Sequence, residues 1–336
     1  MINILFTSAG RRSYLIQFFK EALDGTGLVH AANSEVLSPA FGVADKSVVS
    51  PLIYDETYIP FLKRYCLAND IKAIVPLFDP DLPVLAKHKA EFESMGVKVI
   101  VSDLDVVTVC NDKWRTFIFL KESGLNTPKT FINVEDALQA LQNKDIAYPV
   151  ILKPRWGMGS IALFEADDES ELKVFYRKIK KEIKRTYLQY ESAMDFENSV
   201  LIQEKLPGGE YNLDIINDLA GNYQNTIVKK KFAIRAGETD CAKIVNNAGL
   251  KKFGEVLGKK LRHTADLDVD VFCQNGTIYI LEMNARFGGG YPFSHISGVN
   301  LPLAIVKWLQ GDVVESNLLQ EEFNVIAYKD IRVMKV

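Results

Sequence analysis

The sequence predicts an α/β protein, with a doubly wound parallel-sheet domain at its N-terminus and a two-lobed α+β region after it. Before about residue 107, short apolar runs alternate with segments of helical periodicity, which is typical of a parallel sheet flanked by helices. Later strands are longer, and Asn275-Gly276 forms a tight turn of the kind that joins antiparallel strands. We expect three parts: residues 1–107, residues 108–205 (a linker helix and a small lobe) and residues 206–336 (a large lobe with a short tail).

The first part alternates strands and helices. An apolar strand over residues 2–6 ends at a turn of small residues with Gly10, and apolar side chains then recur at helical spacing from Tyr14 to Leu23. The remaining elements expected here are strands at residues 28–32, 73–78 and 97–101, and helices at residues 59–67 and 82–95.

The two later parts mix helices with hairpins. Asn111-Asp112 is a good N-cap for a helix over residues 113–123, which Gly124 would end. The other elements expected in the middle part are strands at residues 150–153, 161–165 and 200–203, and one long helix over residues 168–190. Those expected in the last part are strands at residues 211–216, 226–232, 269–273, 277–283 and 325–328, and helices at residues 249–261 and 301–309.

Composition excludes several classes of protein. The chain has 336 residues, of which 48% are hydrophobic and 25% charged, an ordinary globular balance, and its formal net charge is −3. A nucleic-acid-binding domain is usually basic, so no nucleic-acid partner is expected. The four cysteines form no C-x-x-C pair and are expected to be reduced, and the four histidines form no zinc pattern.

The N-terminus and the hydropathy predict a cytoplasmic chain without a membrane partner. The first apolar run precedes two arginines, which is the reverse of the charge order in a secretory signal. No stretch reaches the roughly 18 consecutive apolar residues of a membrane span.

The strongest local motif is PVILKPRWGMGS, residues 149–160. An apolar strand delivers Lys153, and the loop that follows contains Gly157 and Gly159 before Ser160. Glycines let backbone amides approach phosphate oxygens closely, and a lysine supplies a point charge. The alternative is an ordinary hairpin with a surface lysine. The motif differs from a Walker A loop, because the lysine precedes the glycines.

A second motif, VDVFCQNGTIYILEMNARFGGG, covers residues 269–290. Glu282, Asn284 and Arg286 alternate along a strand and therefore share one face. A carboxylate beside an amide oxygen suits magnesium, and Asp270 on the partner strand could face the same metal. Arg286 could neutralise charge on a transferring phosphoryl group. The alternative is a polar hairpin face with a salt bridge.

A third motif is LIQEKLPGGEYNLDI, residues 201–215. A strand runs into an extended stretch and a Pro-Gly-Gly turn, and a second strand opens with Glu210. The extended stretch could offer backbone groups to an adenine edge, and Glu210 could accept hydrogen bonds from ribose hydroxyls. The alternative is a routine loop.

These three motifs, in this order, resemble the ATP-grasp superfamily, most closely biotin carboxylase and the large chain of carbamoyl-phosphate synthetase. The resemblance covers nearly the whole chain, because the N-terminal part looks like the family's pre-ATP-grasp domain. It implies that ATP and Mg²⁺ are the cofactors. The sequence has no biotin-related or glutaminase segment, which argues against activity on bicarbonate.

The resemblance also implies roles for individual residues. It implies that NDKWRTFIFLKESGLNTPKTF is the family's linker helix. The residues implied to bind ATP are Lys113 and Lys153 (phosphates), Gly157, Gly159 and Ser160 (the glycine loop), Gln203, Glu204, Lys205 and Leu206 (the adenine hinge) and Glu210. The implied metal ligands are Asp270, Glu282 and Asn284, and the implied catalytic residues are Lys153 and Arg286.

Substrate residues are expected at loops. Arg11 and Arg12 lie at the mouth of the first turn and could bind an anionic substrate, the alternative being surface charge. Asp79 and Asp81 follow a strand, where ligands bind in open α/β sheets, and could meet an amine, the alternative being turn-forming aspartates. SAGRRS lacks the G-x-G-x-x-G pattern, which argues against a nicotinamide cofactor.

A basic segment with Lys231 and Arg235 could shape an acceptor pocket, or could protect a sheet edge.

The sequence therefore predicts a ligase that phosphorylates a carboxylate with ATP and couples the acyl phosphate to an amine or a similar nucleophile. Its expected partners are small-molecule carboxylate and amine substrates, with a homodimer as a candidate assembly. One alternative is a carbamoyl-phosphate-synthetase-like phosphorylating subunit that needs a partner chain. Another is an ATP-binding regulatory module without chemistry, which the intact set of lysines and metal ligands argues against.

Overall fold

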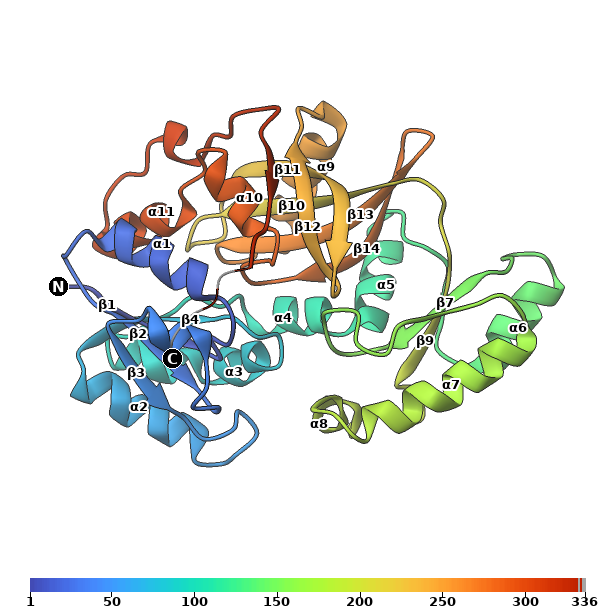
Figure 1. The fold of residues 1–336 in the computed structure, drawn as a ribbon, viewed down its shortest axis with the longest axis horizontal. Coiled ribbons are helices and arrows are strands. Elements are labelled where there is room, and N and C mark those ends of the chain that lie inside the picture. Colours follow the sequence, from blue (N-terminus) through green and yellow to red (C-terminus); the bar gives the residue numbers. More distant parts are fainter. Residues whose placement is uncertain (332, 334–336) are drawn as a thin grey trace.

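The computed structural model describes residues 1–331 and 333, which form three sheets. Figure 1 shows the N-terminal sheet in blue, the small lobe in green at the opposite end, and the large lobe in yellow to red between and above them. The N-terminal sheet is entirely parallel, with the strand order β3-β2-β1-β4-β5. Its strands are β1 (Asn3–Thr7), β2 (Val29–Asn33), β3 (Lys46–Val49), β4 (Ile71–Pro76) and β5 (Lys98–Val99). The predicted fold class is confirmed here.

Helices cover both faces of this sheet. The helices of the N-terminal part are α1 (Ser13–Leu23), α2 (Tyr58–Ala68) and α3 (Asp81–Ser94). Because side chains alternate along β1, Ile4 and Phe6 pack in the core with α1, whereas Leu5 packs with α2 and α3. The α1 side also buries α11 (Leu301–Gln310) of the large lobe, so the two ends of the chain share one core.

The small lobe is a four-stranded antiparallel sheet with the order β6-β9-β7-β8. Its strands are β6 (Thr130–Phe131), β7 (Val150–Pro154), β8 (Phe164–Ala166) and β9 (Val200–Glu204). Its helices are α6 (Val134–Gln142), α7 (Glu169–Ile183) and α8 (Leu188–Ser192). The strand expected at residues 161–165 begins later, because Ser160 and Ala162 have positive φ and keep that stretch a loop.

The long helix expected over residues 168–190 is wrong. Helix α7 ends at Ile183, and a turn separates it from α8. Thr186 donates its hydroxyl to the carbonyl of Glu182 at 3.1 Å, which satisfies an acceptor at the end of α7. Ile183 and Leu188 both remain in the core of the small lobe, so the turn lets the chain change direction without exposing either side chain.

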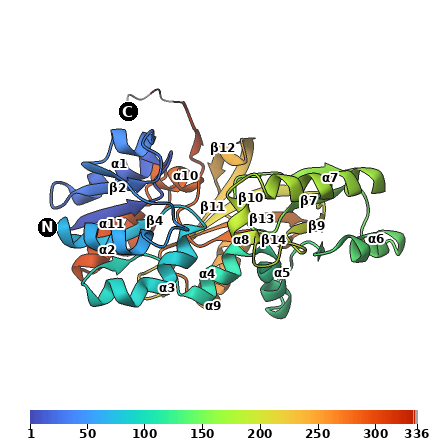
Figure 2. The ribbon, with the colours of Figure 1, turned by 90° about the horizontal axis from the view of Figure 1, so that it is seen from below.

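The large lobe is a six-stranded antiparallel sheet with the order β14-β13-β10-β11-β12-β15. Its strands are β10 (Gly209–Asn217), β11 (Tyr223–Arg235), β12 (Glu238–Ile244), β13 (Asp266–Gln274), β14 (Thr277–Asn284) and β15 (Ile326–Tyr328). The helices are α4 (Leu104–Asn111), α5 (Lys113–Glu122), α9 (Ala248–Leu261) and α10 (Tyr291–Ile296). One apolar core joins α4, α5 and α9 to β10, β13 and β14. Figure 2 shows these helices beside the strands of the large sheet.

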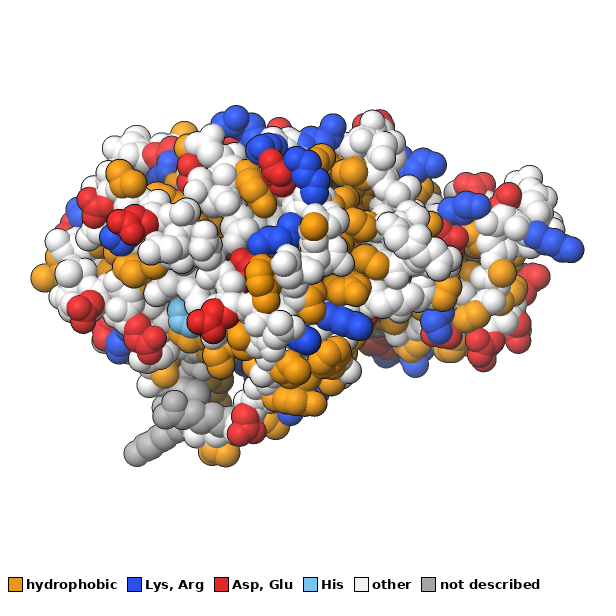
Figure 3. Space-filling view, turned by 90° about the horizontal axis from the view of Figure 1, so that it is seen from above, with side chains coloured by type: hydrophobic (Ala, Val, Ile, Leu, Met, Phe, Trp, Pro, Cys, Tyr) orange, Lys and Arg blue, Asp and Glu red, His pale blue; other side chains and the backbone are white. Residues whose placement is uncertain are grey.

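The linker helix forms as the sequence predicts. Asp112 caps α5 by accepting from the backbone amides of Trp114 and Arg115 at 3.0 and 3.3 Å. The boundaries at residues 107 and 205 stay a prediction. On the face in Figure 3, basic and acidic side chains are interspersed. Among the described residues, no helix is long and apolar enough to cross a membrane, and all four cysteines are free thiols.

Candidate active site

One face of the large sheet carries the polar side chains that the second motif predicts. Asp270 pairs with Glu282 across β13 and β14, and Asp268 pairs with Asn284 two residues further on. Residues two apart on a strand project from the same face, so all four side chains lie together. The opposite face packs against α4, α5 and α9, so this polar face is directed away from those helices.

Lys113 reaches this face from the first turn of α5. Its Nζ lies 3.8 Å from Oε2 of Glu282 and donates to the carbonyl oxygen of Gly157. The start of α5 is held rigidly, because Arg155 donates two hydrogen bonds of 2.7 Å to the carboxylate of the N-cap, Asp112. The linker helix thereby connects the glycine loop of the small lobe to the carboxylates of the large lobe.

Lys153 enters the same space from β7. Its side chain is buried, and among the described residues no carboxylate lies at ion-pair distance from its ammonium. Burial lowers the pKa of Lys153 to about 8, Glu282 and Asp270 oppose that change, and Lys113 adds to it. An ammonium that is buried near carboxylates but not paired with them is suited to an anionic ligand such as a phosphate.

The glycine loop lies against two neighbours. A Cβ at Gly157 would meet Leu188 at 2.4 Å, and a Cβ at Gly237, in the β11–β12 turn, would meet the backbone of Gly159 at 2.6 Å. Gly157, Gly159 and Ser160 all have positive φ, which glycine adopts without strain. The loop is thus closed onto the large lobe, with Gly159 and Ser160 exposed.

The donor set fits magnesium only in part. Asn284 donates its amide to Asp268 at 3.3 Å, which leaves its oxygen free to act as a ligand beside Glu282. Asp270 instead accepts from Lys231 at 2.8 Å and from Asn212 at 2.8 Å. The described residues hold no group of three His, Cys, Asp or Glu side chains suited to a metal. Magnesium at this site would therefore need phosphate oxygens to complete its ligand shell.

Lys231 lies beside the metal-binding candidates rather than in a separate acceptor pocket. Its ammonium lies 2.5 Å from Glu210 and 2.8 Å from Asp270. Burial lowers the pKa of Lys231, but the two carboxylates outweigh burial and raise it. Lys231 thereby keeps its positive charge between Glu210, the predicted ribose acceptor, and Asp270, a predicted metal ligand.

Arg286 joins the large lobe to the N-terminal domain. Its guanidinium donates to Asp79 at 3.0 Å and to Asp268 at 3.1 Å, and all three side chains are buried. Burial lowers the pKa of Arg286, while Asp79 and Asp268 raise it above its ordinary value. Asp79, which the sequence predicts to meet a substrate, accepts from Arg286 through one oxygen. Its other oxygen, Oδ1, has no hydrogen-bond partner in the part of the chain that the structure describes.

The remaining substrate candidates differ in position. Arg12 donates to the carbonyl oxygen of Phe287, next to Arg286. Arg11 is exposed. Arg235 pairs with Asp240 at 2.6 Å across its own hairpin. The structure therefore brings Arg12 to the site and gives Arg11 and Arg235 no contact with it.

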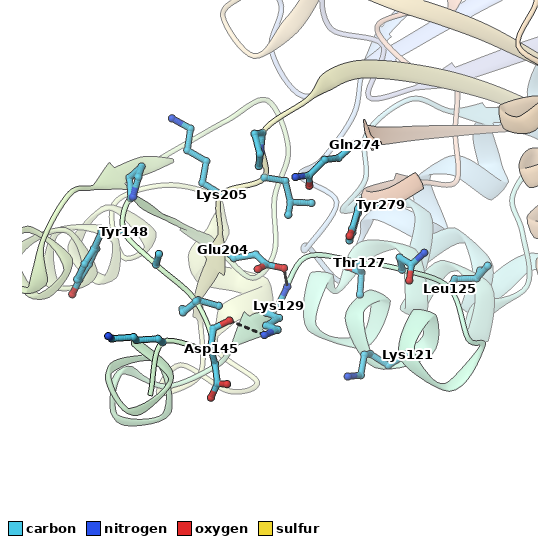
Figure 4. A pocket seen from close by; sticks show the side chains of 17 residues that line it. Lys121, Leu125, Thr127, Lys129, Asp145, Tyr148, Glu204, Lys205, Gln274 and Tyr279 are labelled. Atoms are coloured by element: carbon cyan, nitrogen blue, oxygen red, sulfur yellow. Dashed lines mark hydrogen bonds between the residues drawn. The ribbon is translucent and has the colours of Figure 1, made fainter. Parts of the chain in front are cut away.

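The predicted adenine hinge lies beside an open pocket (Figure 4). Glu204 turns its carboxylate outward and accepts from the amide of Lys129 at 2.7 Å, and Lys205 pairs with Glu165 at 2.7 Å. Gln203 is buried and donates to Thr130. The hinge residues that line the pocket are Glu204, Lys205 and Leu206. Neither lysine of the triphosphate prediction is among the residues that line it.

Sequence reasoning missed several residues of this site. Asp266, Asp268 and Asp270 alternate along β13, a signal that could have indicated a polar strand face. Lys229 and Asp214 form a fully buried ion pair of 2.5 Å on that same face, where Asp214 lies opposite Asp268. No local motif marks that pair, because its members lie on separate strands that only the sheet brings together.

Comparisons with known proteins find two family models that match this chain. The family model described as PylC-like, N-terminal domain matches residues 4–100, and the model described as ATP-grasp in the biosynthetic pathway with Ter operon matches residues 196–332. The carbamoyl phosphate synthase large chain of Campylobacter jejuni is 24% identical over 326 residues, which are 92% of this chain and 28% of that protein. The chain thus spans little more than a quarter of the length of this relative.

Solved structures share the fold. The biotin carboxylase domain dimer of Hydrogenobacter thermophilus 2-oxoglutarate carboxylase, crystallised with MgADP, ADP and bicarbonate, has a TM-score of 0.72 at 18% identity and covers 96% of this chain and 73% of its own. The L-amino acid ligase from Bacillus licheniformis has a TM-score of 0.72 at 19% identity and covers 99% of this chain and 82% of its own. The family models and the Campylobacter jejuni relative confirm the predicted resemblance, and the solved structures confirm the predicted fold class.

Proposed function

We propose that this chain, which belongs to the ATP-grasp superfamily, is an ADP-forming ligase that activates a carboxylate with ATP and Mg²⁺ and couples it to an amine. The observation that carries the proposal is the convergence of Lys113 and Lys153 on Glu282, from two different elements, on the polar face of the large sheet. Such a junction of cations and oxygen ligands suits a triphosphate and its metal.

Each group has a role in this proposal. Lys113, Lys153 and the loop with Gly157, Gly159 and Ser160 bind the phosphates, and residues 203–206 hold the adenine. Glu282 and Asn284, with Asp270 if Lys231 releases it, hold magnesium, which would offset the charge on the phosphates when bound. Glu210 accepts from the ribose.

The reaction needs no protein nucleophile. A carboxylate oxygen attacks the γ-phosphorus, the bond between that phosphorus and the β–γ bridging oxygen breaks, and ADP leaves. The amine nitrogen then attacks the acyl carbon of the acyl phosphate, inorganic phosphate leaves, and the amine loses a proton. Arg286, fixed by Asp79 and Asp268, neutralises charge that develops on the transferring phosphoryl group.

The experiment is ADP release by the purified chain with ATP, Mg²⁺ and pooled amino acids. We expect release that depends on both the metal and the pool. Absence of release with every carboxylate and amine offered would contradict the ligase, and would favour a binding module.

A second candidate is a phosphorylating subunit that needs a partner. The observation that favours it is that this chain covers 28% of the carbamoyl phosphate synthase large chain it resembles. This candidate predicts ADP release only after a second protein is added, whereas the ligase predicts release by the chain alone.

The assembly and the location follow from the same proposal. A homodimer is the assembly we propose, because one structural neighbour is a biotin carboxylase domain dimer. Sedimentation equilibrium would test it, and a monomer at assay concentration would contradict it. Use of ATP suits the cytoplasmic location that the sequence predicts.

A further inference from the structure

The N-terminal domain and the small lobe meet at an aromatic seam. Tyr54, in the loop before α2, stacks on Tyr190 of α8 with ring centroids 4.1 Å apart. Phe78, after β4, packs edge-on against Tyr187 at 5.1 Å. These contacts hold α8 beside the carboxyl end of the parallel sheet, although the two segments are far apart in the sequence.

The two aspartates that follow β4 differ in how their carboxylate oxygens are hydrogen-bonded. Both oxygens of Asp81 are satisfied, one by the Tyr58 hydroxyl at 2.9 Å and the other by the Ser8 hydroxyl at 3.0 Å. Asp79 is also buried, but only its Oδ2 is used, by Arg286. Its Oδ1 has no hydrogen-bond partner among the described residues. A buried acceptor of this kind costs stability unless a ligand satisfies it.

Glu191 of α8 faces the same point. Burial raises the pKa of Glu191 to about 7, and the nearby carboxylates of Asp79 and Asp112 raise it further. The ammonium of Lys113 opposes this rise. Burial and Asp79 raise the pKa of Tyr187 to about 12, and Glu191 adds to the rise while the backbone of Met158 opposes it. Because Tyr187 packs against Phe78 and Tyr190 stacks on Tyr54, α8 carries Glu191 to the same seam as Asp79.

The seam also holds further polar atoms without partners. The hydroxyl oxygens of Tyr54 and Tyr187 are buried, and like Oδ1 of Asp79 they have no hydrogen-bond partner in the described structure. Besides burial, Glu191 raises the pKa of Tyr54, which places that hydroxyl within the influence of the same acid. Two carboxylates and two hydroxyls are thus grouped beside aromatic rings. All four can accept hydrogen bonds, so a positively charged hydrogen-bond donor would complement them.

We propose that Asp79 and Glu191 bind the ammonium group of the amine substrate at this seam, with the hydroxyls of Tyr54 and Tyr187 as further acceptors. This inference rests on the proposed ligase function and names its nucleophile as a cationic amine. Primary ammonium carries three N–H donors, which match the separate acceptors here.

The location connects the amine to the chemistry. Asp79 binds Arg286 through one carboxylate oxygen. An ammonium bound to the other oxygen would therefore be separated from Arg286, at the predicted phosphoryl site, only by the Asp79 carboxylate. Glu191, when ionised, takes one proton from the ammonium and becomes a carboxylic acid. The free amine then forms the bond to the acyl carbon, and phosphate leaves with its electron pair.

Hydroxylamine separates this step from activation. It is uncharged at neutral pH and traps acyl phosphates as hydroxamates, so it needs neither an ammonium site nor a base. In Glu191→Gln, we expect hydroxamate formation within about 2-fold of the parent, while ligation to the amine falls by about 100-fold or more. Tyr54→Phe should raise the KM for the amine by about 5- to 10-fold and leave hydroxamate formation unchanged.

Matched controls lie on the same lobe. Glu197→Gln changes an exposed carboxylate and Tyr176→Phe changes a hydroxyl on α7, and both should leave both products unchanged. Equal loss of both products in Glu191→Gln would overturn the amine site, as would full retention of both. A parent that gives neither product would instead overturn the ligase function itself.

Discussion

The two seams of the molecule are built from different kinds of element. At the seam between the small and large lobes, Lys153 lies in β7, Glu282 in β14 and Lys113 in the first turn of α5. At the seam with the N-terminal domain, Asp79 and Tyr54 lie in loops and Glu191 in the short helix α8. Strands and long helices fix a position rigidly, which suits phosphoryl transfer, whereas loops vary and suit recognition of a particular substrate.

The charges of the two seams differ in the same way. The first combines two lysines with carboxylates and leaves Lys153 without an ion-pair partner among the described residues. The second offers buried acceptors, and its buried cation, Arg286, is already held by Asp79 and Asp268. The first seam therefore suits a polyanion with its metal, and the second suits a cation.

The largest effect should come from Glu282→Gln at the first seam. The change keeps the size of the side chain but removes the charge that would hold magnesium against the phosphates. We expect ADP release to fall by about 100- to 1,000-fold, with the ligand-free melting temperature unchanged. Glu165→Gln, an exposed carboxylate on β8, is the control. Full magnesium-dependent release by Glu282→Gln would show that this carboxylate is only structural.

Lys153→Ala should weaken ATP binding next most strongly. A hydrogen bond to a charged group contributes about 1.5–3 kcal/mol, which corresponds to about 10- to 100-fold in affinity. Lys113→Ala should act in the same direction, and it also frees the Gly157 carbonyl. Titration with ATP measures both, and Lys173→Ala is the control, since that exposed lysine of α7 pairs with Glu169 and lies outside the predicted ATP site. Unchanged affinity in both variants would rule out the phosphate assignment.

The sequence predicted the first seam better than the second, for a physical reason. The sequence alone predicts that Glu282, Asn284 and Arg286 lie together, because strand residues two apart must share a face. Asp79 was singled out, since ligands bind at the carboxyl ends of parallel strands. Glu191 was not, because the expected long helix hid the turn at Thr186 that brings α8 to the seam. Side chains that meet only through tertiary packing leave no local pattern.

Asp268→Asn should have a smaller effect, at the point where the two seams join. Asp268 orients both Arg286 and Asn284, at 3.1 and 3.3 Å, without lying among the predicted metal ligands. An asparagine keeps one acceptor but loses the charge. We expect kcat to fall by about 10-fold, with KM for ATP little changed. A large rise in KM for ATP with no change in kcat would show that Asp268 acts on nucleotide binding instead.

Asp81→Asn should leave turnover unchanged and alter only stability, which separates Asp81 from Asp79 in the same loop. Burial raises the pKa of Asp81 to about 6, against 3.8 for the free group, and hydrogen bonds from Thr7, Tyr58 and Ser8 only partly oppose this. A folded-state pKa above the unfolded value means that the native chain binds the proton more tightly. Its contribution to stability is therefore complete below about pH 4 and is lost as pH rises through about 6. The difference between the two pKa values corresponds to about 3 kcal/mol of folding free energy.

Urea unfolding between pH 4 and 7 should show the parent losing stability relative to Asp81→Asn over that window, because the amide cannot ionise. Parallel pH profiles for the two proteins would show that Asp81 carries no such cost, and a loss of turnover in Asp81→Asn would place it with Asp79 at the substrate.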